Sequence, residues 1–277
     1  MTALYDAYVA VDWSASSLPK SGADSIWLCV DGREPENHRT RHAATLRIRD
    51  VLYRVLREGR RTLIGFDFPF GYPHGFAEFA APGPGPPWRR VWDLLSSRIR
   101  DDERNANNRF EVAAELNHGT GPFWGCPMRR QGPRLTTKRT SPFPHCGLAE
   151  LRAVDRRTRG VQSVWKLGGA GSVGSQALLG IPRVAQLRAD PALERDSRIW
   201  PFESGFVVPS AQIVFVEVWP RLVARATHPV KDAAQVAGVV RHWRRLDASG
   251  RLDTLFEPSA APAKAKNEEG WIFGVTA

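Results

Sequence analysis

The sequence predicts an α/β protein in which helices flank a mixed sheet made of a hairpin and parallel strands. Three observations favour this class. Two apolar segments open the chain, a segment of helical period follows them, and two more apolar segments lie on either side of a long middle region. Sheets with helices on their faces define the α/β class. The 277 residues suffice for one such domain with a large insertion.

The first two apolar segments predict a β-hairpin. Residues 7–12 are continuously apolar until they end in Asp12, which is typical of a short buried strand. Turn-forming residues separate this segment from a second predicted strand at 25–30. A third strand, at the sheet edge, is expected within 32–44.

The helix and the remaining core strands follow in order. Apolar residues recur at helical spacing over 45–58, and Gly59 stands where a C-cap glycine is expected. Residues 62–67 predict a buried strand that ends in Asp67. The last predicted strand spans 211–219, and a helix is expected at 231–246.

These elements predict one domain over 1–277, with a core of 1–73 and 205–277 and an insertion of about 74–204. Near the end of the chain, residues 261–269 predict a mobile loop. Within the insertion we expect helices at 88–104, at 108–116 and after the glycine-rich segment as far as a break at Pro182, and a loop at 119–145.

Hydropathy and cysteine usage exclude several classes of protein. No window approaches the roughly 18–20 apolar residues of a membrane span, and the start of the chain lacks the basic region of a signal peptide. The three cysteines form no CxxC pair, which disfavours a disulfide framework or a structural zinc site. We therefore expect a cytoplasmic protein without a membrane partner.

The net charge of +10 comes mainly from arginine, since only six of the 39 basic residues are lysine. Guanidinium groups suit phosphate oxygens, so nucleic acid or a phosphorylated small molecule is an expected partner. A basic, soluble surface without such a partner explains the composition equally well, because the charges are scattered along the chain.

Acidic residues stand at the ends of the predicted strands. Asp12, Asp67 and Glu217 do so, and Asp232 begins the following helix. If these strands are neighbours, the carboxylates converge, and converged carboxylates must be protonated or neutralised by a cation. Magnesium or manganese takes such oxygen ligands and can support phosphodiester cleavage. We expect these four residues to be catalytic and metal-binding.

Each acid also has a local explanation. Asp12 could cap the turn that follows it, Glu217 could pair with Arg221, and Asp232 could be an ordinary acid at a helix N-terminus. The backbone after Asp67 is stiff, because the prolines of FPFGYP fix φ along the turn. Such a turn suits a ligand that must be held in place, and it is equally compatible with a purely structural role.

Five motifs carry a resemblance that spans 9–274. They are VAVDWSAS, IGFDFPFGYP, VEVWP, KDAAQV and EEGWIFG. Together they resemble a large family of proteins that have a ribonuclease H-like fold and are described as predicted nucleases. The resemblance implies that Asp12 lies in the first hairpin, that Asp67 lies on the adjacent parallel strand, and that Glu217 and Asp232 follow the insertion. The chain departs from the family at Gln235, where members often have a second acid.

A glycine-rich segment, GAGSVG, precedes a predicted helix. As a dinucleotide motif it is weak, because no clean strand precedes it. Its backbone amides and Lys166 would make a phosphate cradle, although a flexible connector explains the glycines equally well. The residues expected to bind phosphate or substrate are Ser14, Arg109, Lys166, Gly169, Gly171 and Gly174.

Three hypotheses of function follow. The first is a metal-dependent nuclease in which the arginine-rich insertion holds the substrate. The second is an ATP-dependent phosphotransferase of actin-like core fold, in which VDWSAS and GAGSVG cradle phosphates. The third is a non-catalytic protein that binds nucleic acid or nucleotides. Six tryptophans could stack on bases, although core positions are commoner for this residue: Trp13, Trp88, Trp92, Trp124, Trp165 and Trp200.

Overall fold

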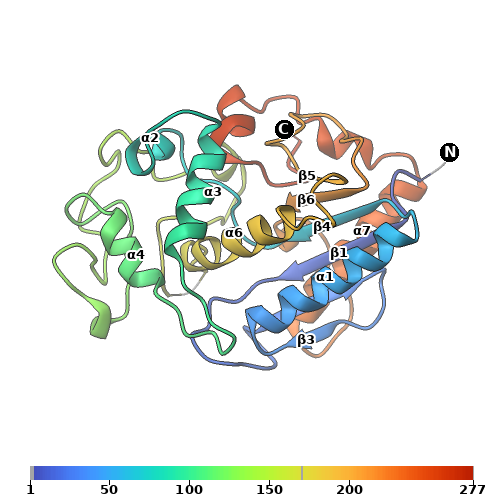
Figure 1. The fold of residues 1–277 in the computed structure, drawn as a ribbon, viewed down its shortest axis with the longest axis horizontal. Helices are drawn as coiled ribbons and strands as arrows, with labels where there is room; N and C mark the ends of the chain where they lie inside the picture. The colour runs from blue at the N-terminus through green and yellow to red at the C-terminus, as the bar shows by residue number, and fades with distance from the viewer. Residues whose placement is uncertain (1–2, 170, 277) are drawn as a thin grey trace.

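A single mixed sheet of six strands forms the centre of the computed structural model, which describes residues 3–169 and 171–276 (Figure 1). The strand order is β3-β2-β1-β4-β6-β5. The strands are β1 (Ala7–Asp12), β2 (Ile26–Val30), β3 (Glu36–His38), β4 (Thr62–Phe66), β5 (Ser197–Ile199) and β6 (Ile213–Glu217).

The pairing of the strands confirms the predicted mixed sheet. β1 pairs with β2 in antiparallel register and with β4 in parallel register. β6 is parallel to both β4 and β5, and β3 is the expected edge strand beside β2. The sequence did not predict β5, because three residues are too few to show a period.

Helices cover both faces of the sheet. The apolar sides of α1 (Arg41–Arg57) and α6 (Gly174–Arg188) join alternate strand residues such as Val11 and Phe66 in one hydrophobic cluster. The apolar side of α7 (Lys231–Ala248) joins the other residues, including Ala10, in a second cluster on the opposite face. The alternation of side chains along each strand therefore separates the core into two layers.

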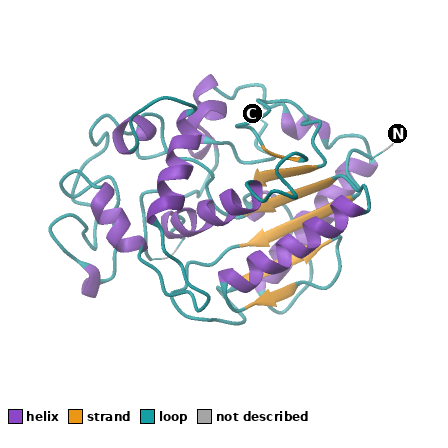
Figure 2. Cartoon of the chain, viewed as in Figure 1, coloured by secondary structure: helices purple, strands orange, loops and turns teal. Residues whose placement is uncertain are grey.

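The remaining helices are short and lie mostly in the middle of the chain. The carboxyl ends of the parallel strands point toward this region (Figure 2). The middle of the chain also contributes β5 to the central sheet and α6 to the helices that cover the sheet. These short helices are α2 (Phe76–Ala80), α3 (Pro87–Arg98), α4 (Arg109–Leu116), α5 (Ala153–Arg157), η1 (Met128–Arg130), η2 (Pro220–Leu222), η3 (Asp253–Phe256) and η4 (Ala265–Glu269).

Three expectations about these elements were wrong. α6 continues through Pro182, because its apolar side is buried and offsets the loss of one backbone hydrogen bond. The segment 261–269 is not a mobile loop, since it contains η4 and buries Glu268 and Glu269. α3 ends at Arg98, six residues earlier than expected.

The aromatic residues and hydropathy agree with a packed α/β protein. Five of the six tryptophans considered for base stacking are buried, and Trp124 is half-buried. Ring faces that are covered by protein cannot stack on bases, so these five belong to the core. Among the described residues, no helix has both the length and the apolar character that crossing a membrane requires.

Candidate functional site

Asp12 and Asp67 lie side by side at the carboxyl ends of two neighbouring parallel strands. Val11 is in register with Phe66, and the Asp67 amide donates a hydrogen bond of 2.9 Å to the Val11 carbonyl oxygen. Adjacent strands are about 4.8 Å apart, so the two aspartates occupy equivalent positions. Both side chains point to the face of the sheet that α7 covers. Gly65, two residues before Asp67, faces the same way, since a Cβ added there would lie 2.6 Å from Trp243 of α7.

Asp232 reaches the same edge from the first turn of α7. Its carboxylate accepts a hydrogen bond of 2.7 Å from the backbone amide of Asp24, which lies in the hairpin loop after Asp12. The negative charge of Asp232 raises the pKa of both Asp12 and Asp67. The structure therefore brings together three of the four acids that the sequence singled out.

Burial and mutual repulsion govern the ionisation of the two strand aspartates. Burial, and next the charge of Asp67, hold the pKa of Asp12 well above its usual range. Burial, followed by the charges of Glu217 and Asp232, raises the pKa of Asp67 to about 7. Neither aspartate forms an ion pair with the described residues. A cation at this edge would relieve the repulsion.

Glu217 has a different environment. It is in register with Phe66 and thus points to the other face of the sheet. Its carboxylate accepts hydrogen bonds of 2.8 and 2.7 Å from the fully buried guanidinium of Arg152, which also pairs with Asp155. The burial of Glu217 raises its pKa, and Arg152 lowers it. The contacts of Glu217 therefore do not support its expected role as a ligand beside the aspartates, and its proposed partner Arg221 is replaced by Arg152.

Glu217 instead fixes the turn that follows Asp67. Its carboxylate accepts a hydrogen bond of 2.9 Å from the Phe70 amide. The ring of Phe68 lies against α6 at Gly180, where a Cβ would come within 2.4 Å of the ring. Gly71 lies against η4, and a Cβ there would be 2.3 Å from the Glu268 carbonyl oxygen. The stiff backbone after Asp67 is thus held between α6 and the C-terminal segment.

The two glutamates of EEGWIFG complete this attachment. Glu268 accepts hydrogen bonds from the amides of Gly75 and Ala77 at 3.0 and 2.7 Å. Glu269 accepts from the amides of His74 and Ala153 at 3.0 and 2.8 Å. Both side chains are buried and satisfied, so this motif acts structurally by anchoring the turn after Asp67.

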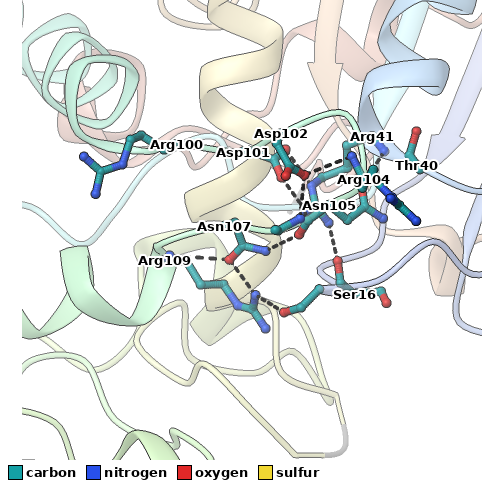
Figure 3. Close-up of polar contacts among 12 residues, drawn as sticks. Ser16, Thr40, Arg41, Arg100, Asp101, Asp102, Arg104, Asn105, Asn107 and Arg109 are labelled. Atoms are coloured by element: carbon teal, nitrogen blue, oxygen red, sulfur yellow. Dashed lines mark hydrogen bonds and ion pairs between the residues drawn. The ribbon is translucent and has the colours of Figure 1, made fainter.

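The loop after Asp12 is held by an arginine that the sequence did not reveal. Arg41 is fully buried and pairs with Asp101 (Figure 3). Its guanidinium also donates to the backbone oxygens of Ser14 and Ser16 at 3.0 and 2.8 Å. The Ser14 hydroxyl donates to the backbone carbonyl oxygen of Asp24 at 2.9 Å. Because an arginine at a helix start usually faces solvent, no local pattern could have indicated this role.

Gly174, the last glycine of the glycine-rich segment, is held by close backbone contacts. A Cβ at Gly174 would lie 2.3 Å from the Val164 carbonyl oxygen, so only glycine fits there. Gly169 and Gly171 have φ values of +87° and +70°, which favour glycine. Lys166 Nζ donates to Gln162 at 3.3 Å. These contacts set the position at which α6 begins, and they leave the phosphate role of the loop as a prediction.

The donor chemistry fits a hard divalent cation only in part. Within the described residues, no group of three or more Asp, Glu, His or Cys side chains is arranged to hold one ion. Asp12 and Asp67 offer two adjacent oxygen ligands, and water or substrate oxygens commonly complete such a site. The fit is thus to a site of two carboxylates, with Asp232 close enough to influence both.

Comparisons of the chain with family models, with curated proteins and with solved structures each found no match.

Proposed function

We propose that this protein is a metal-dependent phosphodiester hydrolase with a ribonuclease H-like fold. One observation carries the proposal. Asp12 and Asp67 lie next to each other on parallel strands, at the carboxyl edge of the sheet, with raised pKa values and without a basic ion-pair partner among the described residues. The hairpin order β3-β2-β1 followed by parallel β4 and β6 supports the fold that the five motifs imply.

In this proposal the residues divide the work by position. Asp12 and Asp67 would hold magnesium or manganese, and Asp232, from α7, would orient a water molecule near them. A divalent ion at such carboxylates activates water and stabilises the leaving oxygen of a phosphodiester. Arg41 keeps the loop after Asp12 in place, and Glu217 with Arg152 keeps the turn after Asp67 in place.

The charge of the insertion supports a polyanionic substrate. The sequence has no acidic residue between Glu115 and Glu150, and all five of its Lys and Arg residues there are exposed. Basic side chains of this kind bind phosphate groups through charge and hydrogen bonds. Two of the five pair with acids, namely Arg130 with Glu111 and Arg139 with Glu150. The other three are Arg129, Arg134 and Lys138.

The two alternatives have less support. A phosphotransferase would need the loop after Asp12 to cradle phosphates, but the Ser14 hydroxyl already donates to Asp24. A purely binding role would be favoured if Asp12 and Asp67 were far apart or neutralised by arginines. They are adjacent, and in the described part of the chain neither forms an ion pair with an arginine. Gln235, the missing second acid, is buried and leaves the proposal resting on three aspartates.

Cleavage assays test this function. With manganese present, the wild type should cleave DNA, RNA or the small diester bis(p-nitrophenyl) phosphate. Asp12→Asn should lower the rate at least ~100-fold, because transition-state stabilisation by a metal is worth several kcal/mol. Asp253→Asn, in the exposed η3 turn, is the matched control and should keep the wild-type rate. Cleavage by a folded Asp12→Asn protein at the wild-type rate would contradict the proposal.

A further inference from the structure

Arg109 is a buried arginine without a carboxylate partner. Arg109 is 9% exposed to solvent and forms no ion pair with any of the described residues. The two other buried arginines differ in this respect, since Arg41 pairs with Asp101 and Arg152 pairs with Asp155 and Glu217. A buried charge without a counter-ion is costly, so Arg109 calls for an anion from outside the chain.

The hydrogen bonds of Arg109 leave part of its guanidinium available. Nη1 donates to Asn107 Oδ1 at 2.7 Å (Figure 3). Nη1 also donates to Ser17 Oγ at 3.0 Å, and Nε donates to the Ser175 hydroxyl at 2.9 Å. All three acceptors are uncharged. Nη2, with two N–H groups, forms no hydrogen bond with the residues described. Burial, and next the charge of Arg41, lower the pKa of Arg109 to about 10, and the charges of Asp101 and Glu111 offset only part of this lowering.

The guanidinium lies at the N-terminus of α6, a second source of positive potential. α6 has 15 residues, and its N-cap Val173 provides no side-chain acceptor. The amides of Ser175 and Gln176 have no backbone acceptor among the described residues, whereas the Gly174 amide bonds to Lys166. A cation at the positive end of a helix is repelled by it, unless an anion lies between them.

We propose that Arg109, the first turn of α6 and Ser17 bind a phosphate group. The two N–H groups of Nη2 and the amides of Ser175 and Gln176 provide four donors, which suits the three terminal oxygens of a phosphate monoester. The site adjoins the chain just after β1, because Gln176 Nε2 donates to the backbone oxygen of Trp13, the residue that follows Asp12. A nucleotide chain that extends from a terminal phosphate bound there would run toward the carboxyl edge of the sheet, where Asp12 lies. This catalytic meaning rests on the proposed function, whereas phosphate binding does not.

Titration calorimetry in EDTA tests the binding, with three probes: inorganic phosphate, a 5′-phosphorylated dinucleotide and the same dinucleotide without that phosphate. The wild type should bind the phosphorylated dinucleotide at least ~10-fold more tightly than the unphosphorylated one. Tighter binding than that of inorganic phosphate would identify the nucleotide terminus as the ligand. Equal binding would identify free phosphate and overturn the assignment to a nucleotide terminus. The proposal is overturned if neither phosphate probe binds.

Matched variants locate the site. Arg109→Gln should weaken phosphate binding at least ~10-fold. Arg100→Gln makes the same charge change on a side chain that points away from this cluster, and it should bind as the wild type does (Figure 3). Should Arg109→Gln fail to fold, Ser17→Ala on the exposed loop should still weaken binding severalfold with an unchanged Tm. Wild-type binding by either folded variant would contradict the site.

These experiments separate the two proposals. Asp12→Asn should still bind the phosphate probes in EDTA, because no metal and no cleavage are involved. If cleavage is absent while phosphate binding depends on Arg109, the hydrolase proposal fails and the phosphate site stands. If cleavage depends on Asp12 while Arg109→Gln binds phosphate as before, the phosphate site fails and the hydrolase proposal stands.

Discussion

At the scale of single residues, the protonation of Asp67 matters most. Partial burial raises the pKa of its carboxyl group, and so do the negative charges of Glu217 and Asp232, while Arg221 and Lys231 offset only part of this repulsion. Asp12 lies beside it, and the pKa of Asp12 is raised by burial and by the charges of Asp67 and Asp232. The metal-free site is therefore under electrostatic strain whenever both aspartates are ionised.

This strain predicts a pH dependence of stability. The pKa of Asp67 is about 7 in the folded protein and near 3.8 when unfolded, so the folded state holds more protons between these values. The stability that this proton contributes should be fully present below about pH 4 and should be lost as the pH rises through 7. Asp67→Asn should reduce the loss between pH 5 and 8 by about 2 kcal/mol in EDTA, because Asp12 continues to titrate.

Denaturant unfolding at both pH values measures this effect, and Asp253→Asn is the control for removing an exposed carboxylate. An Asp67→Asn protein that loses as much stability as the wild type between pH 5 and 8 would show that Asp67 titrates normally.

At the scale of elements, Arg152 joins three parts of the chain. Arg152 precedes α5 and donates to the carboxylate of Glu217 at the end of β6. It also donates to the backbone carbonyl oxygen of Glu269 in η4 at 3.1 Å. Through the Glu217–Phe70 hydrogen bond, this cluster also holds the turn after β4. The position of Asp67 thus depends on contacts between segments that are distant in the sequence.

Arg152→Met should destabilise the protein by about 3–5 kcal/mol, because it leaves buried carboxylates without a counter-charge. The same substitution in a Glu217→Gln background should lower the free energy of unfolding by less, since one of the carboxylates left without a counter-charge is then absent. Urea unfolding measures both, with the exposed Arg159→Met as the control near the same helix. Additive costs for the two substitutions would show that Arg152 and Glu217 are not coupled.

At the scale of the whole molecule, the carboxyl edge of the sheet faces the insertion (Figure 2). The aspartates lie at this edge, the N-terminus of α6 adjoins it through Gln176 and Trp13, and the segment at Trp124 packs beside Lys166 just ahead of α6. If the two proposals hold, this arrangement brings carboxylates that would hold a metal and basic groups that would bind phosphate to the same edge of the sheet. The net charge of +10 would draw polyanions toward it.

Sequence patterns predicted those parts of the site that depend on local periodicity. The bounds of β1 match the expected strand, and the expected strand at 62–67 is β4, which ends one residue before Asp67. Because β1 and β4 pair in parallel register, Asp12 and Asp67 lie at one edge of the sheet. Glu217 lies opposite Phe66, one position before the level of Asp67, so its side chain points to the other face of the sheet. No pattern in the sequence specifies this register.

The structural roles of buried polar residues could not be predicted in the same way. Arg41 and Arg152 look like surface arginines in a chain rich in them, because partners such as Asp101 and Glu217 lie far away in the sequence. The buried glutamates of η4 were hidden for the same reason, in a segment whose composition is typical of loops. Long-range ion pairs leave no local periodicity.

The most direct measurement for the central claim is manganese binding by calorimetry. The wild type should bind manganese at micromolar concentration, the Asp12→Asn, Asp67→Asn double variant should lose this binding, and Asp253→Asn should retain it. Circular dichroism would establish that all three proteins are folded. A folded wild type that binds no manganese, or a double variant that binds it as tightly, would contradict a metal site at these two aspartates.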